Sequence, residues 1–133
     1  MFTAIIADDE KASARLLHET LEASGKVKVL AVAANGLECL EYLDEQEPDV
    51  LFLDIQMGDP SGIDVAETVL EGEKPPLIVF VTGHTDYAVK AFALAALDYV
   101  VKPVELCDFE TRINETIIRI EETLQTQQLP ALN

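Results

Sequence analysis

The chain has 133 residues, 49% of them apolar, which fits one domain of ordinary size with a full hydrophobic core. Its 25 acidic and 9 basic residues give a formal net charge of −16. A field of that sign repels nucleic-acid phosphates and anionic lipid headgroups, so composition argues against direct binding to nucleic acid or to a membrane surface.

The N-terminal residues lack the pattern of a targeting segment. Met1 leads almost directly into a strand-like stretch, without the basic and then apolar regions of a signal peptide. The longest apolar runs, such as 50–53 and 75–81, are far too short to span a bilayer. We therefore expect a cytoplasmic location.

Five short runs, rich in apolar and β-branched residues, predict strands. They are Thr3–Ala7, Val27–Ala33, Val50–Leu53, Leu77–Thr82 and Asp98–Val101. Several are apolar at nearly every position, which is typical of strands buried on both faces of a parallel sheet.

Amphipathic segments with helical periodicity lie between and after these strands. They are Glu10–Ser24, Gly36–Gln46, Gly62–Glu71, Asp86–Ala95 and Glu105–Gln127. In the Ala-rich fourth segment, Phe92 is the only large side chain that we expect to anchor the helix. The alternation predicts one α/β domain over residues 1–125, a doubly wound parallel sheet with helices on both faces. Residues 126–133 lose the periodicity and predict a tail or the start of a linker.

Polar residues follow the ends of four predicted strands. Asp8-Asp9 comes after the first strand, Asp54 after the third, Thr82 ends the fourth, and Lys102 follows the fifth. Ligands of an open parallel sheet bind outside the carboxyl ends of its strands, so we expect these side chains to converge at one edge. Carboxylates suit Mg²⁺, and a carboxylate can attack a phosphoryl group to form an aspartyl-phosphate. The lysine and the hydroxyl would bind phosphoryl oxygens.

Each of these residues also has an ordinary structural interpretation. Asp8 and Asp9 precede a helix, where Asp is favoured as an N-cap, and taken alone this is the better interpretation. Asp54 could stabilise the following turn, Thr82 could be a plain strand-end hydroxyl, and Lys102 a solvated surface lysine. These interpretations are independent and would have to coincide at four strand ends, so the functional hypothesis is favoured for the set.

Four segments resemble the signature segments of response-regulator receiver domains. They are Ile5–Glu10, Leu51–Met57, Val81–Gly83 and Asp98–Pro103. Order and spacing match over about residues 2–125. The resemblance implies a flavodoxin-like (βα)5 fold with strand order 2-1-3-4-5, which the pattern alone does not supply.

The resemblance also implies a role for each residue in the acidic cluster. Asp54 would be the phosphoacceptor, and it would share a Mg²⁺ ion with its neighbours. Asp9 would bind the metal directly, Asp8 largely through water, and Gln56 through its backbone carbonyl. Gln56 and His84 flank the acceptor and would tune the lifetime of the phosphate, although an exposed loop histidine is the simpler interpretation of His84.

Three further residues would respond to phosphorylation. Thr82 and Tyr99 resemble the switch pair, in which the hydroxyl moves onto the phosphoryl group and the ring turns inward behind it. Lys102 resembles the phosphoryl-binding lysine, and the Lys102–Pro103 bond would be cis. One departure is that Gly58 stands where members of the family often have proline, while a proline follows at Pro60, so we expect a changed loop path.

A finer resemblance concerns the partners. Residues 87–92, with Ala95-Ala96 and Asp98-Tyr99, resemble receivers joined to LytTR-type DNA-binding domains; such an output domain is absent from this chain. The partner that supplies the phosphoryl group would be a sensor histidine kinase. We also hypothesise that small residues of the fourth helix (Ala88, Ala91 and Ala95) permit close approach in a dimer formed on phosphorylation.

Three alternative functions are weaker. A phosphatase of the haloacid-dehalogenase type would need a second acid two residues after the acceptor, where Gln56 stands. A flavin-binding module would need a phosphate loop after the first strand, where Asp8-Asp9-Glu10 would repel phosphate. A pseudo-receiver would have lost key residues, all of which are present.

Overall fold

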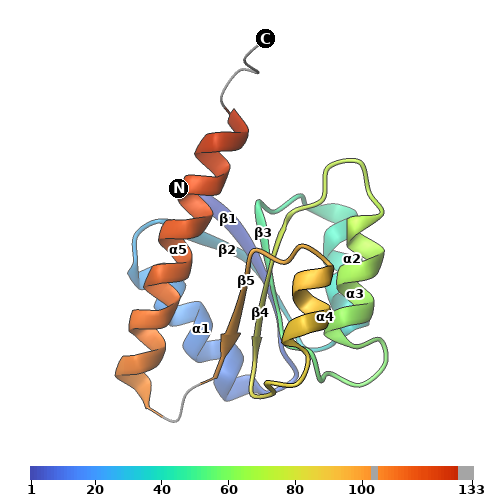
Figure 1. The fold of residues 1–133 in the computed structure, drawn as a ribbon, viewed down its shortest axis with the longest axis horizontal. Coiled ribbons are helices and arrows are strands. Elements are labelled where there is room, and N and C mark those ends of the chain that lie inside the picture. The colour runs from blue at the N-terminus through green and yellow to red at the C-terminus, as the bar shows by residue number, and fades with distance from the viewer. Residues whose placement is uncertain (103–104, 129–133) are drawn as a thin grey trace.

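The computed structural model describes residues 1–102 and 105–128, and strands alternate with helices throughout (Figure 1). The elements are β1 (Phe2–Ala7), α1 (Lys11–Ala23), β2 (Val27–Ala33), α2 (Gly36–Glu45), β3 (Val50–Leu53), α3 (Gly62–Leu70), β4 (Leu77–Thr82), α4 (Ala88–Ala93), β5 (Asp98–Val101) and α5 (Leu106–Gln128). Four strands have the predicted bounds, and β1 begins one residue earlier than predicted. The predicted fold class is confirmed.

The five strands form one parallel sheet in the order β2-β1-β3-β4-β5, as the resemblance implied. The chain therefore leaves β1 toward one edge of the sheet and returns to build β3 on the other side of β1. This reversal opens a crevice between the carboxyl ends of β1 and β3, which is where an open α/β sheet binds ligands.

Helices cover both faces of the sheet, with α1 and α5 on one side and α2, α3 and α4 on the other (Figure 1). Neighbouring residues of a strand point to opposite faces, so each strand contributes to two apolar layers. Ile6 and Phe52 pack in the layer under α1 and α5, whereas Ile5 and Leu51 pack in the layer under α2 and α3. Burial on both faces explains why the strands are apolar at nearly every position.

The fourth helix differs from its prediction. It spans only Ala88–Ala93, and Ala95 lies beyond it with a φ of 59°. The prediction that Phe92 anchors this helix is wrong, because Phe92 is 61% exposed while Ala91 is fully buried. The small side chain of Ala91 faces the sheet, and the next residue is rotated by about 100° toward solvent.

The first helix begins at a different cap from the one considered. Its N-cap is Glu10, which makes no side-chain capping bond within the described residues, so the N-cap interpretation of Asp8 and Asp9 is wrong. Asp8 instead accepts a hydrogen bond from the backbone N–H of Glu10 at 2.9 Å, a local turn that precedes the helix.

At the other end of the chain, α5 continues to Gln128, so the first residues of the predicted tail are helical. The remainder of that segment lies outside the described residues. Across the part of the chain that the structure describes, no helix combines the length and the apolar character that crossing a membrane requires.

Candidate functional site: an acidic cluster at the carboxyl edge

The residues predicted at the strand ends meet at one edge of the sheet. Asp8 follows β1, Asp54 follows β3, and Lys102 follows β5. The ammonium Nζ of Lys102 lies 2.9 Å from Asp8 Oδ2 and 3.0 Å from Asp54 Oδ2, so one lysine joins segments 48 and 94 residues away in sequence. The convergence that the sequence predicted is therefore present for these three side chains.

Three carboxylates form the acidic cluster: Asp8, Asp9 and Asp54. One oxygen from each lies within 4.8 Å of the others. Asp8 and Asp54 are both 7% exposed, whereas Asp9 is exposed to solvent. A set of three carboxylate oxygens, open on one side to water, fits the donor preferences of a hard divalent cation.

Lys102 partly balances this charge. Burial lowers the pKa of its ammonium, but hydrogen bonds to Asp8 and Asp54 outweigh that effect and raise the pKa above its ordinary value. Lys102 therefore stays protonated. One positive charge beside three carboxylates leaves the cluster with an excess of negative charge, which favours a further cation.

The acceptor candidate Asp54 is held through both its backbone and its side chain. Its N–H donates to the carbonyl of Ala7 at 2.9 Å, and the N–H of Ile55 donates to Asp54 Oδ1 at 2.7 Å. Gly62, at the start of α3, packs directly on this segment: a Cβ at Gly62 would lie 2.0 Å from the carbonyl oxygen of Asp54. Only glycine permits this approach, because any side chain would displace the acceptor's backbone.

The loop between Asp54 and α3 contains both Gly58 and Pro60, the two positions at which the sequence departs from the family pattern. Gly58 has a φ of 85°, and the Asp59–Pro60 peptide bond is cis. Ser61 then caps α3 by a capping box with Asp64, in which each side chain accepts from the other residue's backbone N–H. Gln56 is exposed in this loop.

The residues of the predicted switch pair are both buried. Thr82 is fully buried, and its Oγ1 accepts from the backbone N–H of His84 at 3.4 Å. Tyr99 is 8% exposed, so its ring lies inward, and its hydroxyl donates to the backbone carbonyl of His84. Burial raises the pKa of Tyr99, which keeps the phenol protonated as a donor. His84 itself is half-buried.

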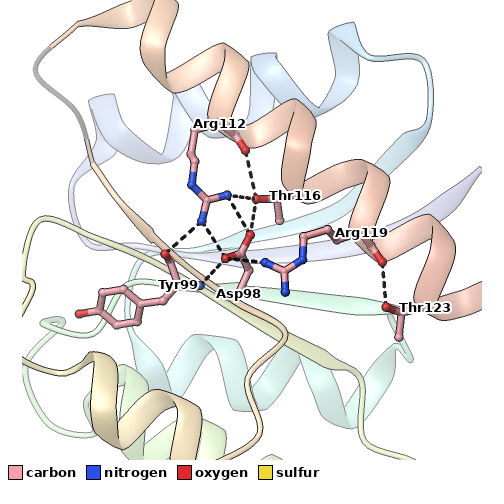
Figure 2. A network of polar contacts seen from close by, with 6 residues as sticks. All are labelled: Asp98, Tyr99, Arg112, Thr116, Arg119 and Thr123. Atoms are coloured by element: carbon pink, nitrogen blue, oxygen red, sulfur yellow. Dashed lines mark hydrogen bonds and ion pairs between the residues drawn. The ribbon is translucent and has the colours of Figure 1, made fainter.

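Sequence reasoning missed three features around this site. The close approach of Gly62 carries no signal beyond a glycine at a helix start. The carbonyl of His84 is a backbone group that any residue could supply. The third is a set of polar contacts that Arg112 and Thr116 make to Asp98 (Figure 2). The sequence contains a signal for it, because Asp98 is a charged residue in an apolar strand and Arg112 and Thr116 are four residues apart on one helix. The predicted cis bond at Lys102–Pro103 lies outside the described residues.

Comparison with known proteins decides the family. The family model of the response regulator receiver domain matches residues 4–114. The chain belongs to this family. The receiver is 40% identical, over 99% of its length, to a response regulatory protein of Vibrio parahaemolyticus, of which it covers 54%. It is 41% identical, over 84% of its length, to the sensory transduction protein LytR of Staphylococcus haemolyticus, of which it covers 43%. The receiver thus spans about half the length of these relatives.

Solved structures agree with the receiver fold. The response regulatory domain of protein mrkE from Klebsiella pneumoniae superposes with a TM-score of 0.85 at 27% identity, over 93% of this chain and 98% of that one. The response regulator TrrA of Thermotoga maritima, in complex with Mg²⁺-BeF, superposes with a TM-score of 0.73 at 29% identity, over 86% of this chain and 98% of that one.

Proposed function

We propose that this receiver is a phosphorylation-dependent switch that accepts a phosphoryl group on Asp54 from the phosphohistidine of a sensor histidine kinase. The observation that carries the proposal is the buried Asp54 carboxylate, with Lys102 Nζ at 3.0 Å and the carboxylates of Asp8 and Asp9 beside it. The candidate nucleophile, the carboxylates that would bind Mg²⁺ and the lysine that would bind the phosphoryl group therefore lie close together, which supports the proposal.

The chemistry follows from these positions. Asp54 Oδ1 accepts from the N–H of Ile55 and Oδ2 from Lys102; we assign the attack on phosphorus to Oδ2, because it lies beside the lysine that would bind the transferred oxygens. The new O–P bond forms as the N–P bond to the kinase imidazole breaks, and the released imidazole takes up a proton. Lys102 then pairs with the transferred oxygens, and Thr82 Oγ1 donates to them. Asp9 and Asp54 directly, Asp8 through water and the carbonyl of Gln56 would hold Mg²⁺, which neutralises charge on the transferring group.

The Mg²⁺ proposal is supported by the donor chemistry of the acidic cluster and by the TrrA structure, which is a complex with Mg²⁺-BeF. The domain's role is regulatory and not that of a turnover enzyme, because Gln56 stands where a phosphatase would place its second acid. A cytoplasmic location is part of the proposal, because the receiver would meet its proposed phosphoryl donor, a sensor histidine kinase, there.

The proposal includes an output beyond this chain. The receiver covers 43% of the LytR relative, which supports an output domain of the LytTR DNA-binding type and a role in transcription. Residues 1–125 would be the receiver proper, and residues 126–133, of which 126–128 continue α5, would be a tail or the start of a linker. The chain itself carries a charge of −16 and would not bind nucleic acid or a membrane directly.

We also propose that phosphorylation favours a homodimer through α4, β5 and α5. The sequence suggested that small residues of the fourth helix permit close approach in this dimer, but Ala91, one of them, packs against the receiver's own sheet. Exposed apolar side chains support the surface instead: Val89 and Phe92 on α4, Val101 on β5 and Ile118 on α5. Sedimentation of the phosphorylated receiver should show a dimer. A monomer at full phosphorylation would remove this part of the proposal.

The phosphoryl acceptor is tested by intact mass after incubation with acetyl phosphate and Mg²⁺. We expect one phosphoryl adduct, absent from Asp54→Ala and from a sample with EDTA. Asp44→Ala, which removes an exposed carboxylate of α2, is the matched control and should retain the adduct. An adduct on Asp54→Ala would overturn the assignment. Continuous phosphate release without an adduct would favour a phosphatase.

A further inference from the structure

A second carboxylate, Asp98, is buried at the start of β5. It is 3% exposed and lies on the face of the sheet that α5 covers (Figure 2). Arg112 grips it with two bonds, Nη1 to Oδ2 at 2.9 Å and Nη2 to Oδ1 at 2.7 Å. Thr116 Oγ1 donates to Oδ2 at 2.7 Å, and Arg119 Nη1 lies 3.2 Å from Oδ1. The carboxylate therefore fastens β5 to two turns of α5.

The same groups also hold the backbone of Tyr99. β5 is the outer strand of the sheet, and the N–H of Lys102 donates inward to the carbonyl of Thr82 on β4 at 2.8 Å. In a parallel ladder, every second residue directs its backbone N–H and C=O to the same neighbour, so those of Tyr99 face the open edge. There, the N–H of Tyr99 donates to Asp98 Oδ1 at 2.9 Å, and Arg112 Nη2 donates to the carbonyl of Tyr99 at 3.3 Å.

Tyr99 is thus connected on both faces of the sheet. Its ring points to the α4 side, where the hydroxyl bonds the carbonyl of His84. Its backbone is tied to α5 through Asp98 and Arg112. If the loop after β4 moves, it can displace the Tyr99 ring through the hydroxyl's bond to His84. The Tyr99 backbone can then pass that movement to α5 through its bonds to Asp98 and Arg112.

We propose that Asp98 and Arg112 form a clamp that makes Tyr99 and α5 move as one unit, so that α5 reports the state of the phosphorylation site. The proposal deepens the switch function and rests on it. In a receiver with the clamp broken, Asp54 would still accept the phosphoryl group, while the response of the outer face of α5 would fall by at least about half.

The chain offers a matched control for the clamp. Arg112 and Arg119 both pair with Asp98 from α5, but within the described residues only Arg112 also bonds Tyr99. Arg112→Met and Arg119→Met remove the same charge from the same helix. Arg112→Lys keeps the charge without the two-bond grip, and serves if the Met variant does not fold.

The first test uses backbone amide hydrogen exchange by NMR on the unphosphorylated protein. The Tyr99 amide donates to Asp98 Oδ1, and Arg112 holds both that carboxylate and the Tyr99 carbonyl. We expect this amide to exchange about fivefold faster in Arg112→Met than in wild type, a factor that corresponds to the free energy of one typical hydrogen bond. Arg119→Met should leave it unchanged. Equal exchange in the two variants would overturn the clamp, and this result does not depend on phosphorylation.

The second test measures amide chemical-shift changes when acetyl phosphate and Mg²⁺ are added. In wild type and Arg119→Met, we expect the amides of Ile118 and Glu122 on α5 to shift along with that of Ile55 beside the acceptor. In Arg112→Met, the Ile55 shift should remain, and the α5 shifts should fall by at least about half. Undiminished α5 shifts in Arg112→Met would overturn the proposal, whereas absence of a phosphoryl adduct in wild type would count against the switch function and favour a phosphorylation-independent receiver.

Discussion

Two buried carboxylates of this receiver, Asp54 and Asp98, have opposite surroundings. Asp98 accepts hydrogen bonds from Arg112, Thr116 and the backbone of Tyr99, and a second guanidinium stands at 3.2 Å. Asp54 shares one ammonium with Asp8 and has a third carboxylate nearby. The first carboxylate has more than enough positive charge around it, and the second has too little.

This difference separates a structural ion pair from a site built to bind. Burial would raise the pKa of Asp98, but the bonds from Arg112 and Thr116 outweigh burial and bring it down to about 2. A carboxylate so well satisfied has no capacity left for a ligand. The acidic cluster is under-neutralised, and it stores repulsion that a cation or the loss of one charge relieves.

The largest contrast should appear in stability. Asp98→Asn leaves Arg112 partly buried without its partner, and we expect it to lower the free energy of unfolding by about 3 kcal/mol, less than for a fully buried pair because Arg112 is partly exposed. Asp54→Asn should change stability by less than about 1 kcal/mol, since Lys102 keeps Asp8 and repulsion falls. Urea unfolding of both variants measures this. A destabilisation of equal size would remove the distinction between the two sites.

The two buried carboxylates also differ in how far the sequence predicted their surroundings. Asp8, Asp54, Thr82 and Lys102 sit where strands end, and the topology of a parallel sheet alone brings strand ends together. Phe92 was misassigned because periodicity gives the spacing of a helix face and not which residue of a short helix turns inward. The contacts of Asp98 and Gly62 depend on the exact approach of α5 and α3 to the sheet, which helical periodicity leaves open.

Gly62 tests how the acceptor is fixed in place. The backbone of Asp54 is fixed by close packing as well as by hydrogen bonds, since a Cβ at Gly62 would lie 2.0 Å from the carbonyl oxygen of Asp54. Gly62→Ala should therefore cost about 2 kcal/mol of stability and slow phosphorylation of Asp54. Gly83→Ala is the control for stability, because a Cβ there has nothing within 4 Å. Thermal unfolding and adduct formation with acetyl phosphate measure the two effects; a tolerated Gly62→Ala would contradict this packing.

Acid should weaken the stabilising contribution of the Asp98 carboxylate. Its pKa is about 2 in the folded chain against an ordinary value of 3.8, so between these values the unfolded chain binds more protons. The contribution of Asp98, about 2 kcal/mol, is fully present above about pH 4 and is lost as pH falls toward 2. We expect the free energy of unfolding to fall more steeply over this window in wild type than in Asp98→Asn. Parallel curves would show that Asp98 is not the group responsible.

Mg²⁺ should act on the acidic cluster and leave the other carboxylate untouched. At a concentration ten times its dissociation constant, it should stabilise wild type by about 1.4 kcal/mol, because it binds only the folded chain. Asp9→Asn should lose this increment, whereas Asp98→Asn should keep it on a lower baseline. Any salt screens a chain of charge −16, so the reference samples need NaCl at the same ionic strength. If Asp9→Asn kept the Mg²⁺ stabilisation measured against NaCl, the metal would bind elsewhere. Lys102 would then be the cation that the negative charge around Asp54 attracts.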